Sequence, residues 1–309
     1  MGRRLARFTA PFERRLWPGA PVILMYHRVA EPDRDPWSLA VGAERFAEQI
    51  QALQGVRRVL PLGELVKRLR EGTASDEPLA AVTFDDGYLD VFEAARPILH
   101  RFDCPATVFV ATGMVDSSKE FWWDELERIV LASPMLPPSL TRALDPNPEA
   151  RMRLCLRLRR ALRHLPPAEI DRRLAALGGE IGLERRARPA FRTMTSGQVA
   201  GLSDGLITVG AHTINHPSLP HLTAAEQQVE IGQSRRACEA MVGAPVEHFA
   251  YPFGYFDDPS VNAVRRAGFV SACTTVASVA HPRTDPLRLP RMHAGRRTPD
   301  ALLKRLAGG

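Results

Sequence analysis

Short apolar runs alternate with longer segments of helical spacing along most of the chain. The runs are typical of strands buried on both faces, and they cover residues 21–26, 56–60, 79–82, 105–111, 207–211, 246–251, 269–274 and 286–292. Residues 43–53, 62–69, 89–102 and 223–242 predict helices between them, and Asp258 predicts the N-cap of another. The alternation indicates an α/β fold, either a barrel or a doubly wound sheet.

Polar or special residues stand where the apolar runs end. They are His27, Asp85, Asp86, His212, Phe253 and Arg291. In a closed (β/α) barrel the carboxyl ends of all strands converge on one site. This regularity favours the barrel over the open sheet.

The pair Asp85-Asp86 follows the run 79–82 and precedes Gly87. Two carboxylates at the end of a buried strand are costly unless a cation stabilises them. Adjacent residues on an extended strand point in opposite directions, so one can bind a metal while the other faces substrate. On this motif alone, an Asp-Asp-Gly turn on the surface explains the sequence equally well.

A pair of histidines, His212 and His216, follows the run 207–211. Histidines four residues apart suit a metal site when one turn of helix connects them. With one aspartate they complete a set of two histidines and one carboxylate that leaves positions open for water and substrate.

Three segments resemble the motifs of the polysaccharide deacetylase family, also called the NodB-homology or carbohydrate esterase 4 family. They are Thr83–Gly87, His212–His216 and Phe249–Gly254, and they occur in the family's order. The resemblance extends from about Pro21 to about His293. It implies a metal-dependent N-deacetylase on a distorted, TIM-like (β/α) barrel of seven or eight strands.

The resemblance also implies roles for individual residues. Asp86, His212 and His216 would bind one divalent metal, Zn²⁺ first, with Co²⁺ or Ni²⁺ as alternatives. Asp85 would be the general base, and the backbone N–H of Phe253, where the family usually has tyrosine, would stabilise the oxyanion. Tyr251, Pro252 and Gly254 belong to the third motif and are expected to contact the substrate.

The general acid is expected in an unusual place. The family usually has a Leu-x-His motif near the C-terminus, whereas here Ile23–His27 looks like that motif at the N-terminal side. This order resembles the circularly permuted branch that includes poly-N-acetylglucosamine deacetylases. By that resemblance His27 is the acid and Arg291 pairs with Asp85. His293 is the competing acid.

Residues 116–195 interrupt the strand–helix rhythm and predict a helical insertion over the C-terminal face of one domain spanning residues 1–309. The insertion contains Trp122 and Trp123, which would bind a sugar face if exposed. Anchoring of the insertion is the other explanation for this pair. The insertion as a whole is either a lid that docks substrate or a packing layer.

Charge is unevenly distributed over the chain, whose net charge is +6. Residues 1–20 carry five Arg against one acid, and residues 151–192 carry twelve Arg against four acids. These two segments could contact an anionic membrane surface; in residues 1–17 a short helix packed on the barrel is the favoured alternative.

The four cysteines are scattered, which predicts reduced thiols. With no signal peptide and no apolar run long enough to span a membrane, the sequence predicts a cytoplasmic protein, with peripheral contact at the inner membrane as an option.

The leading functional hypothesis is removal of N-acetyl groups from an N-acetylated sugar or polysaccharide. A hydrolase of non-sugar amides is the first alternative, because relatives of the same fold perform that reaction. A non-catalytic binder of anionic ligands is the second, and the complete motif set argues against it. No nucleic-acid partner is expected.

Overall fold

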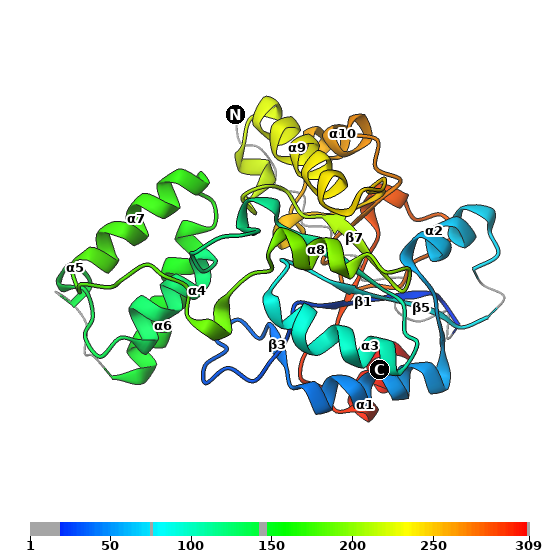
Figure 1. Ribbon diagram of the computed structural model, residues 1–309, viewed down its shortest axis with the longest axis horizontal. Coiled ribbons are helices and arrows are strands. Elements are labelled where there is room, and N and C mark those ends of the chain that lie inside the picture. Colours follow the sequence, from blue (N-terminus) through cyan, green and yellow to red (C-terminus); the bar gives the residue numbers. More distant parts are fainter. Residues whose placement is uncertain (1–18, 75–76, 142–146, 308–309) are drawn as a thin grey trace.

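A parallel sheet organises the protein, as seen in a computed structural model that describes residues 19–74, 77–141 and 147–307. The order of the strands is β10-β1-β5-β6-β7-β8-β9, and all their pairings are parallel. Their bounds are β1 Val22–Tyr26, β5 Leu79–Phe84, β6 Ala106–Val110, β7 Ile207–Ala211, β8 His248–Ala250, β9 Ser271–Cys273 and β10 Met292–His293. Figure 1 shows this sheet wrapped by helices.

The sheet curves into a barrel that is distorted in two places. The short strand β4 (Arg58–Val59) pairs with the first residues of β5, whereas β6 pairs with the last. The edge strands β9 and β10 do not pair directly in the described residues. The gap between them is spanned by one isolated parallel β-bridge, from Cys273 to Leu289. The predicted TIM-like (β/α) barrel is therefore confirmed, with closure through a short irregular segment. A separate two-stranded pairing joins β2 (Arg28–Val29) to β3 (Ala40–Val41).

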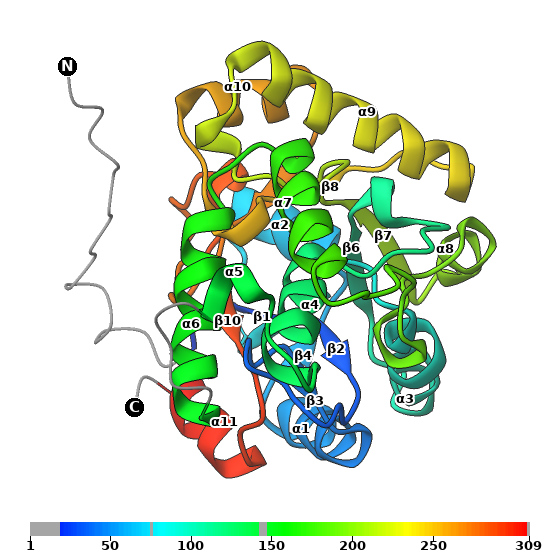
Figure 2. The ribbon, with the colours of Figure 1, turned by 90° about the vertical axis from the view of Figure 1, so that its left-hand side faces the viewer.

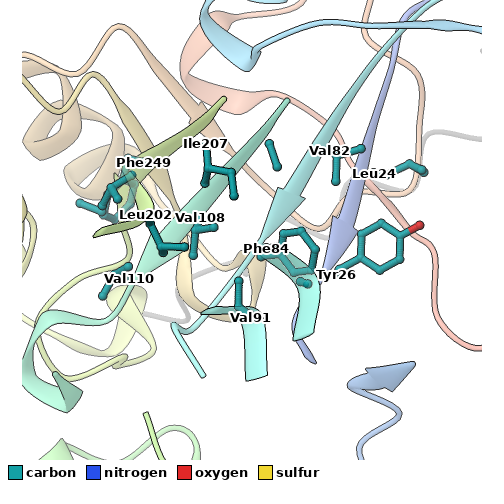
Figure 3. Packing of buried hydrophobic residues seen from close by; sticks show 14 of the residues in the cluster. Leu24, Tyr26, Val82, Phe84, Val91, Val108, Val110, Leu202, Ile207 and Phe249 are labelled. Atoms are coloured by element: carbon teal, nitrogen blue, oxygen red, sulfur yellow. The ribbon is translucent and has the colours of Figure 1, made fainter. Parts of the chain in front are cut away.

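Alternate residues of the strands pack into two hydrophobic clusters. One lies between the sheet and its outer helices and includes Leu24, Tyr26, Val82, Phe84 and Val108 (Figure 3). The other contains the intervening strand residues, such as Ile23, Ala81 and Phe109, together with apolar residues of α2. Because both faces are buried, the strands read in the sequence as continuous apolar runs.

The helices that cover the barrel agree with the predicted ones within a few residues, except that α11 was not predicted. They are α1 Ala43–Val56, α2 Leu62–Glu71, α3 Arg96–Arg101, which continues the π-helical turn η1 Val91–Ala95, α9 Ala224–Val242, α10 Asp258–Arg266 and α11 Pro299–Leu306. The capping box of Thr223 and Glu226 forms as predicted, and Gly243 ends α9 in the left-handed conformation.

Two of the predicted elements need correction. The N-cap of α10 is Asp257, whose carboxylate accepts from the backbone N–H of Ser260, so Asp258 is the first helical residue. The apolar run 286–292 forms a 3₁₀ turn, η7 Pro286–Arg288, and only the two residues of β10 pair as a strand. That run contains two prolines and two arginines, and a proline cannot donate the backbone hydrogen bonds that a longer strand needs. The N-terminal helix predicted within residues 1–17 lies outside the described residues.

A helical layer occupies the chain between β6 and β7. Its helices are α4 Trp122–Glu127, α5 Pro138–Thr141, α6 Pro148–Leu162, α7 Pro167–Gly179 and α8 Ser196–Leu202. Helices α4, α6 and α7 share a hydrophobic cluster that includes Leu126, Leu154 and Leu174. Figures 1 and 2 together show α4 to α7 standing beyond the edge of the sheet where the strands end. No helix in the described part of the chain has the length and apolar character needed to cross a membrane.

Candidate active site

Asp86, His212 and His216 meet at the carboxyl ends of β5 and β7, and all three are buried. The Oδ1 atom of Asp86 lies 3.5 Å from Nε2 of His212 and 3.4 Å from Nε2 of His216. No turn of helix connects the two histidines. Thr213 and His216 have positive φ angles of 66° and 52°, so an irregular loop brings the two rings together.

Glu230 of α9 braces this loop from behind. Its carboxylate accepts hydrogen bonds from the backbone N–H groups of Ile214 and Asn215, at 2.8 and 2.9 Å, and from the Asn215 side chain. The Nδ1 atom of His212 lies 2.7 Å from the carbonyl of Ala250, which directs Nε2 toward Asp86. Glu230 could not be singled out from the sequence, because an acidic residue within a helix is usually solvated.

Unusual backbone conformations concentrate at this site. Of the seven described residues other than glycine with positive φ, four are Asp86, Thr213, His216 and Phe253. Such conformations cost about 1–3 kcal/mol each and persist where the surrounding structure enforces them. The site therefore keeps a strained backbone that holds its side chains in place.

The three residues fit a divalent metal. The Oδ1 atom of Asp86 and the Nδ1 atom of His216 are buried, and neither has a hydrogen-bond partner among the described residues. Burial lowers the pKa of His216 to about 3, so this ring is neutral and able to bind a metal. Burial alone would raise the pKa of Asp86, but His212 and His216 outweigh it and lower that pKa. Two imidazoles and one carboxylate suit Zn²⁺ and similar ions.

Asp85 points to a different partner, the guanidinium of Arg291. Two hydrogen bonds of 2.6 Å join them in a fork, and a third of 3.1 Å reaches the Thr83 hydroxyl. Arg291 is completely buried. Burial alone would raise the pKa of Asp85, but the charge of Arg291 dominates and holds that pKa well below its usual range. Arg291 comes directly before β10, so the prediction that it follows a strand end is wrong.

His27 and His293 lie together beside the two aspartates. Their ring centroids are 5.8 Å apart, because β1 and β10 are neighbours in the sheet. Both Asp85 and Asp86 are close enough to the His27 ring for its charge to lower their pKa values. Burial and the neighbouring His27 lower the pKa of His293 to about 4, so His293 is neutral at pH 7.

The third motif forms a tight turn against His216. The Phe253 ring packs on the His216 ring with centroids 4.5 Å apart, and φ of Phe253 is 58°. Gly254 follows with φ of 72°, and a Cβ there would lie only 2.0 Å from the Thr275 hydroxyl, so only glycine fits. No hydrogen bond from the Phe253 N–H to another described residue is present, which leaves this donor available.

The structure places the other third-motif side chains away from open surface. Tyr251 is fully buried, and its hydroxyl donates to the Leu287 carbonyl at 3.0 Å. Pro252 is also buried. Of this motif, Phe253 and Gly254 are half-buried and remain partly accessible.

Trp122 and Trp123 do not form an exposed pair. Trp123 is only 3% exposed, stacks on Phe121 and packs against His216 with centroids 4.8 Å apart. Its indole N–H donates to the Tyr88 hydroxyl, which in turn donates to Asp124. Trp122 is half-buried among the apolar residues of the insertion. Trp123 therefore forms a wall of the candidate metal site. Trp37, which the sequence did not single out, packs against the cluster that contains Trp123, Tyr88 and Phe121.

Comparison with known protein families agrees with this geometry. Residues 72–133 and 197–272 match the model of the family described as polysaccharide deacetylase. The chain carries a polysaccharide deacetylase domain. The matched segments of this deacetylase domain contain Asp85, Asp86, both metal-site histidines and the third motif. They omit most of the helical insertion and both ends of the chain, where His27 and Arg291 lie.

Relatives of the deacetylase domain share its fold at low identity. The putative polysaccharide deacetylase YxkH of Bacillus subtilis is 21% identical over 260 residues, which span 84% of this chain and 65% of YxkH, just under two thirds of its length. The Streptococcus pyogenes deacetylase PplD, solved in complex with acetate, aligns with a TM-score of 0.64 and 19% identity over 93% of this chain and 98% of that one. IcaB from Ammonifex degensii aligns with a TM-score of 0.62 and 21% identity over 94% and 97% of the two chains.

A hollow of about 680 Å³ lies elsewhere on the deacetylase domain. It is lined by residues of α2 and the start of β8, including Lys67, Arg70 and His248. None of the candidate site residues lines it. The candidate site residues lie instead at the carboxyl ends of the strands, where other (β/α) barrels carry their active sites.

Proposed function

We propose that this protein is a metal-dependent hydrolase that removes N-acetyl groups from an N-acetylated saccharide. One observation carries the proposal: the adjacent carboxylates Asp85 and Asp86 point to different partners. Asp86 faces two histidines in a buried set suited to a metal, and Asp85 faces a guanidinium that keeps it ionised. A metal site beside an ionised base is what hydrolysis of an unreactive amide requires.

Asp86, His212 and His216 would hold the metal. When bound, a divalent ion such as Zn²⁺, with Co²⁺ or Ni²⁺ as alternatives, would polarise the acetyl carbonyl and lower the pKa of water. Asp85 accepts the proton of the attacking water, and Arg291 keeps the carboxylate oriented through its two hydrogen bonds. The N–H of Phe253 donates to the oxygen that becomes negatively charged.

His27 gives the proton that the departing amine needs. The neutral state of His293 at pH 7 argues against His293 in this role, because it carries no extra proton to donate. His293 instead lies against His27 and limits the orientations of its ring. This division of roles follows the permuted order of motifs.

Residues 116–195 are proposed as a helical insertion within one deacetylase domain of residues 1–309. The insertion contributes Trp123 to the wall of the metal site, which supports a role at the active site beyond packing. Of the residues that the sequence assigned to substrate binding, Trp122 and Gly254 are the proposed substrate contacts. Tyr251 and Pro252 support the turn from within.

The test combines metal analysis with acetate release. We expect about one divalent ion per purified chain, and acetate release from chitotetraose that stops on chelation and returns with Zn²⁺ or Co²⁺. His216→Ala should lose both the metal and the activity. His100→Ala, which changes an exposed histidine of α3, is the matched control.

Ring opening of a cyclic ureide without acetate release would favour the non-sugar amide hydrolase. A metal-free protein that is fully active would overturn the proposal.

A further inference from the structure

Two arginines of α6 and the turn after it, Arg159 and Arg163, lie near the candidate active site without acidic partners. Neither forms an ion pair with any described carboxylate. Both are half-buried, whereas the neighbouring Arg157 and Arg160 are exposed to solvent. Four residues apart on a helix, the two side chains share one face.

Arg159 stacks on an aromatic ring close to the metal site. Its guanidinium carbon lies 4.6 Å from the centre of the Trp37 ring, and Trp37 packs on the cluster of Tyr88, Phe121 and Trp123. Its Nε atom is buried and has no hydrogen-bond partner in the described part of the chain. Burial and the nearby charge of Arg163 lower the pKa of Arg159, which indicates that this cation is poorly compensated.

Arg163 reaches the same region from the next turn. Its guanidinium carbon lies 5.6 Å from the centre of the Tyr255 ring, and its Nε donates to His164. The Tyr255 ring is 6.0 Å from the Phe253 ring, which packs on the metal-site histidine His216. Arg163 is thus separated from the metal site by two aromatic side chains.

Most of the other half-buried arginines of the insertion have partners inside the protein. Arg151, which has no ion pair among the described residues, donates to the carbonyl groups of Ser133 and Pro134. Arg185 pairs with Glu125 and Asp171, and Arg188 pairs with Glu120 and Glu127. These pairs satisfy the guanidinium groups inside the protein. Arg159 and Arg163 lack such partners although they face the side of the insertion that approaches the barrel.

We propose that Arg159 and Arg163 form a subsite for an oxyanion carried by the saccharide substrate, either a phosphate or a carboxylate. The inference rests on the proposed deacetylase function and names its substrate class as anionic N-acetylated saccharides. A planar guanidinium can bind such an oxyanion through two parallel hydrogen bonds, and stacking on Trp37 and Tyr255 fixes its plane. The acetylated sugar would then extend from this subsite past the rings of Tyr255 and Phe253 to the candidate metal site.

The experiment compares three probes with the same N-acetylglucosamine unit. Tetra-N-acetylchitotetraose, called chitotetraose here, is neutral. Di-N-acetylchitobiose 1-phosphate carries a phosphate, and a hyaluronan tetrasaccharide carries carboxylates. Acetate release is measured for the wild type and for Arg159→Gln, Arg163→Gln and Arg157→Gln. Calorimetric binding is measured with the same arginine variants in an Asp85→Asn background, where the acetyl group should stay in place.

We expect at least one anionic probe to bind about tenfold or more tightly than chitotetraose, with an affinity that falls as salt rises. Arg159→Gln and Arg163→Gln should each weaken that binding about tenfold and leave chitotetraose turnover within about twofold. Arg157→Gln, on the exposed side of α6, should change neither. The anionic probe that responds identifies phosphate or carboxylate as the ligand.

Equal binding of neutral and anionic probes, unchanged in the two variants, would overturn the subsite while acetate release still upheld the deacetylase. Arginine-dependent binding of an anionic probe without acetate release from any probe would uphold the anion site and overturn the proposed reaction. The two failures are therefore distinguishable.

Discussion

Asp85 and Arg291 form a buried ion pair whose removal tests chemistry and stability separately. Asp85→Asn keeps the shape of the side chain but removes the basic carboxylate, so kcat should fall by about 10²–10⁴-fold. The metal should remain bound, because Asp86, His212 and His216 are unchanged. Steady-state kinetics and metal analysis of the same preparation measure both effects.

The control for this prediction is a double-mutant cycle. Breaking a buried ion pair from one side typically costs about 3–5 kcal/mol of unfolding free energy, because a charge remains buried without a partner. Asp85→Asn combined with Arg291→Gln should recover part of that stability and none of the activity. Recovery of activity in the double variant would contradict the role of Asp85 as base.

His27 and His293 can be separated by their pH profiles. If His27 protonates the amine, His27→Ala should lower kcat about 10²–10⁴-fold and remove the high-pH limb of kcat/KM, because that limb reports a protonated acid. His293→Ala should cost less than about tenfold, since His293 is already neutral at pH 7. An essential His293 beside a dispensable His27 would show that the motifs follow the family's common order.

At this scale the sequence identified the chemical groups but not their surroundings. The residues of the three motifs could be selected because they stand at the ends of apolar runs and match a known order. The positive φ angles of Asp86 and His216 could not be predicted, because tertiary contacts enforce them and residue type does not. Trp37 was missed for the same reason: nothing local shows that it packs against the cluster that contains Trp123.

Among the elements, the loop after β7 depends on α9. Glu230→Gln should weaken metal binding by about 10–100-fold, because the loop that carries His212 and His216 loses the carboxylate that orders its backbone. Competition with a chromophoric chelator measures the affinity. Glu226→Gln on the same helix changes charge equally and keeps a capping side chain, so it should leave metal affinity unchanged.

The elements themselves were predictable where local and tertiary preferences agree. The long buried strands and α9, with its capping box and terminal Gly243, follow directly from apolar pattern and end signals. The run 286–292 was predicted as a strand because its residues are largely apolar. They are buried where the barrel closes irregularly, and most of them form no strand pairing. An apolar run records burial and does not by itself specify pairing.

Over the whole molecule, a buried histidine couples stability to pH. Burial lowers the pKa of His248 to about 4, and its Nδ1 lies 2.9 Å from the Ser271 hydroxyl. Between pH 6.5 and 4 the unfolded chain binds a proton at this residue and the folded protein does not. Its contribution to stability is therefore present above pH 6.5 and lost as pH falls, by up to about 3 kcal/mol.

Urea unfolding at pH 7.5, 6 and 4.5 measures this dependence. His248→Gln should have a smaller loss of unfolding free energy over that range than the wild type. His100→Gln, at an exposed position, should follow the wild-type slope. If the unfolding free energy of His248→Gln falls with pH as steeply as that of the wild type, the acid sensitivity arises from other groups. His293 is then the next to test.

The pairing of β1 with β10 has a consequence for how the protein is made. Asp85 gains its guanidinium partner only when residue 291 has left the ribosome, and His27 meets His293 at the same stage. A nascent chain that already contains His212 and His216 still lacks the organised base and acid of the proposed mechanism. Acetate release should therefore be absent from fragments that stop before Arg291, so catalytic competence reports completed synthesis of the barrel.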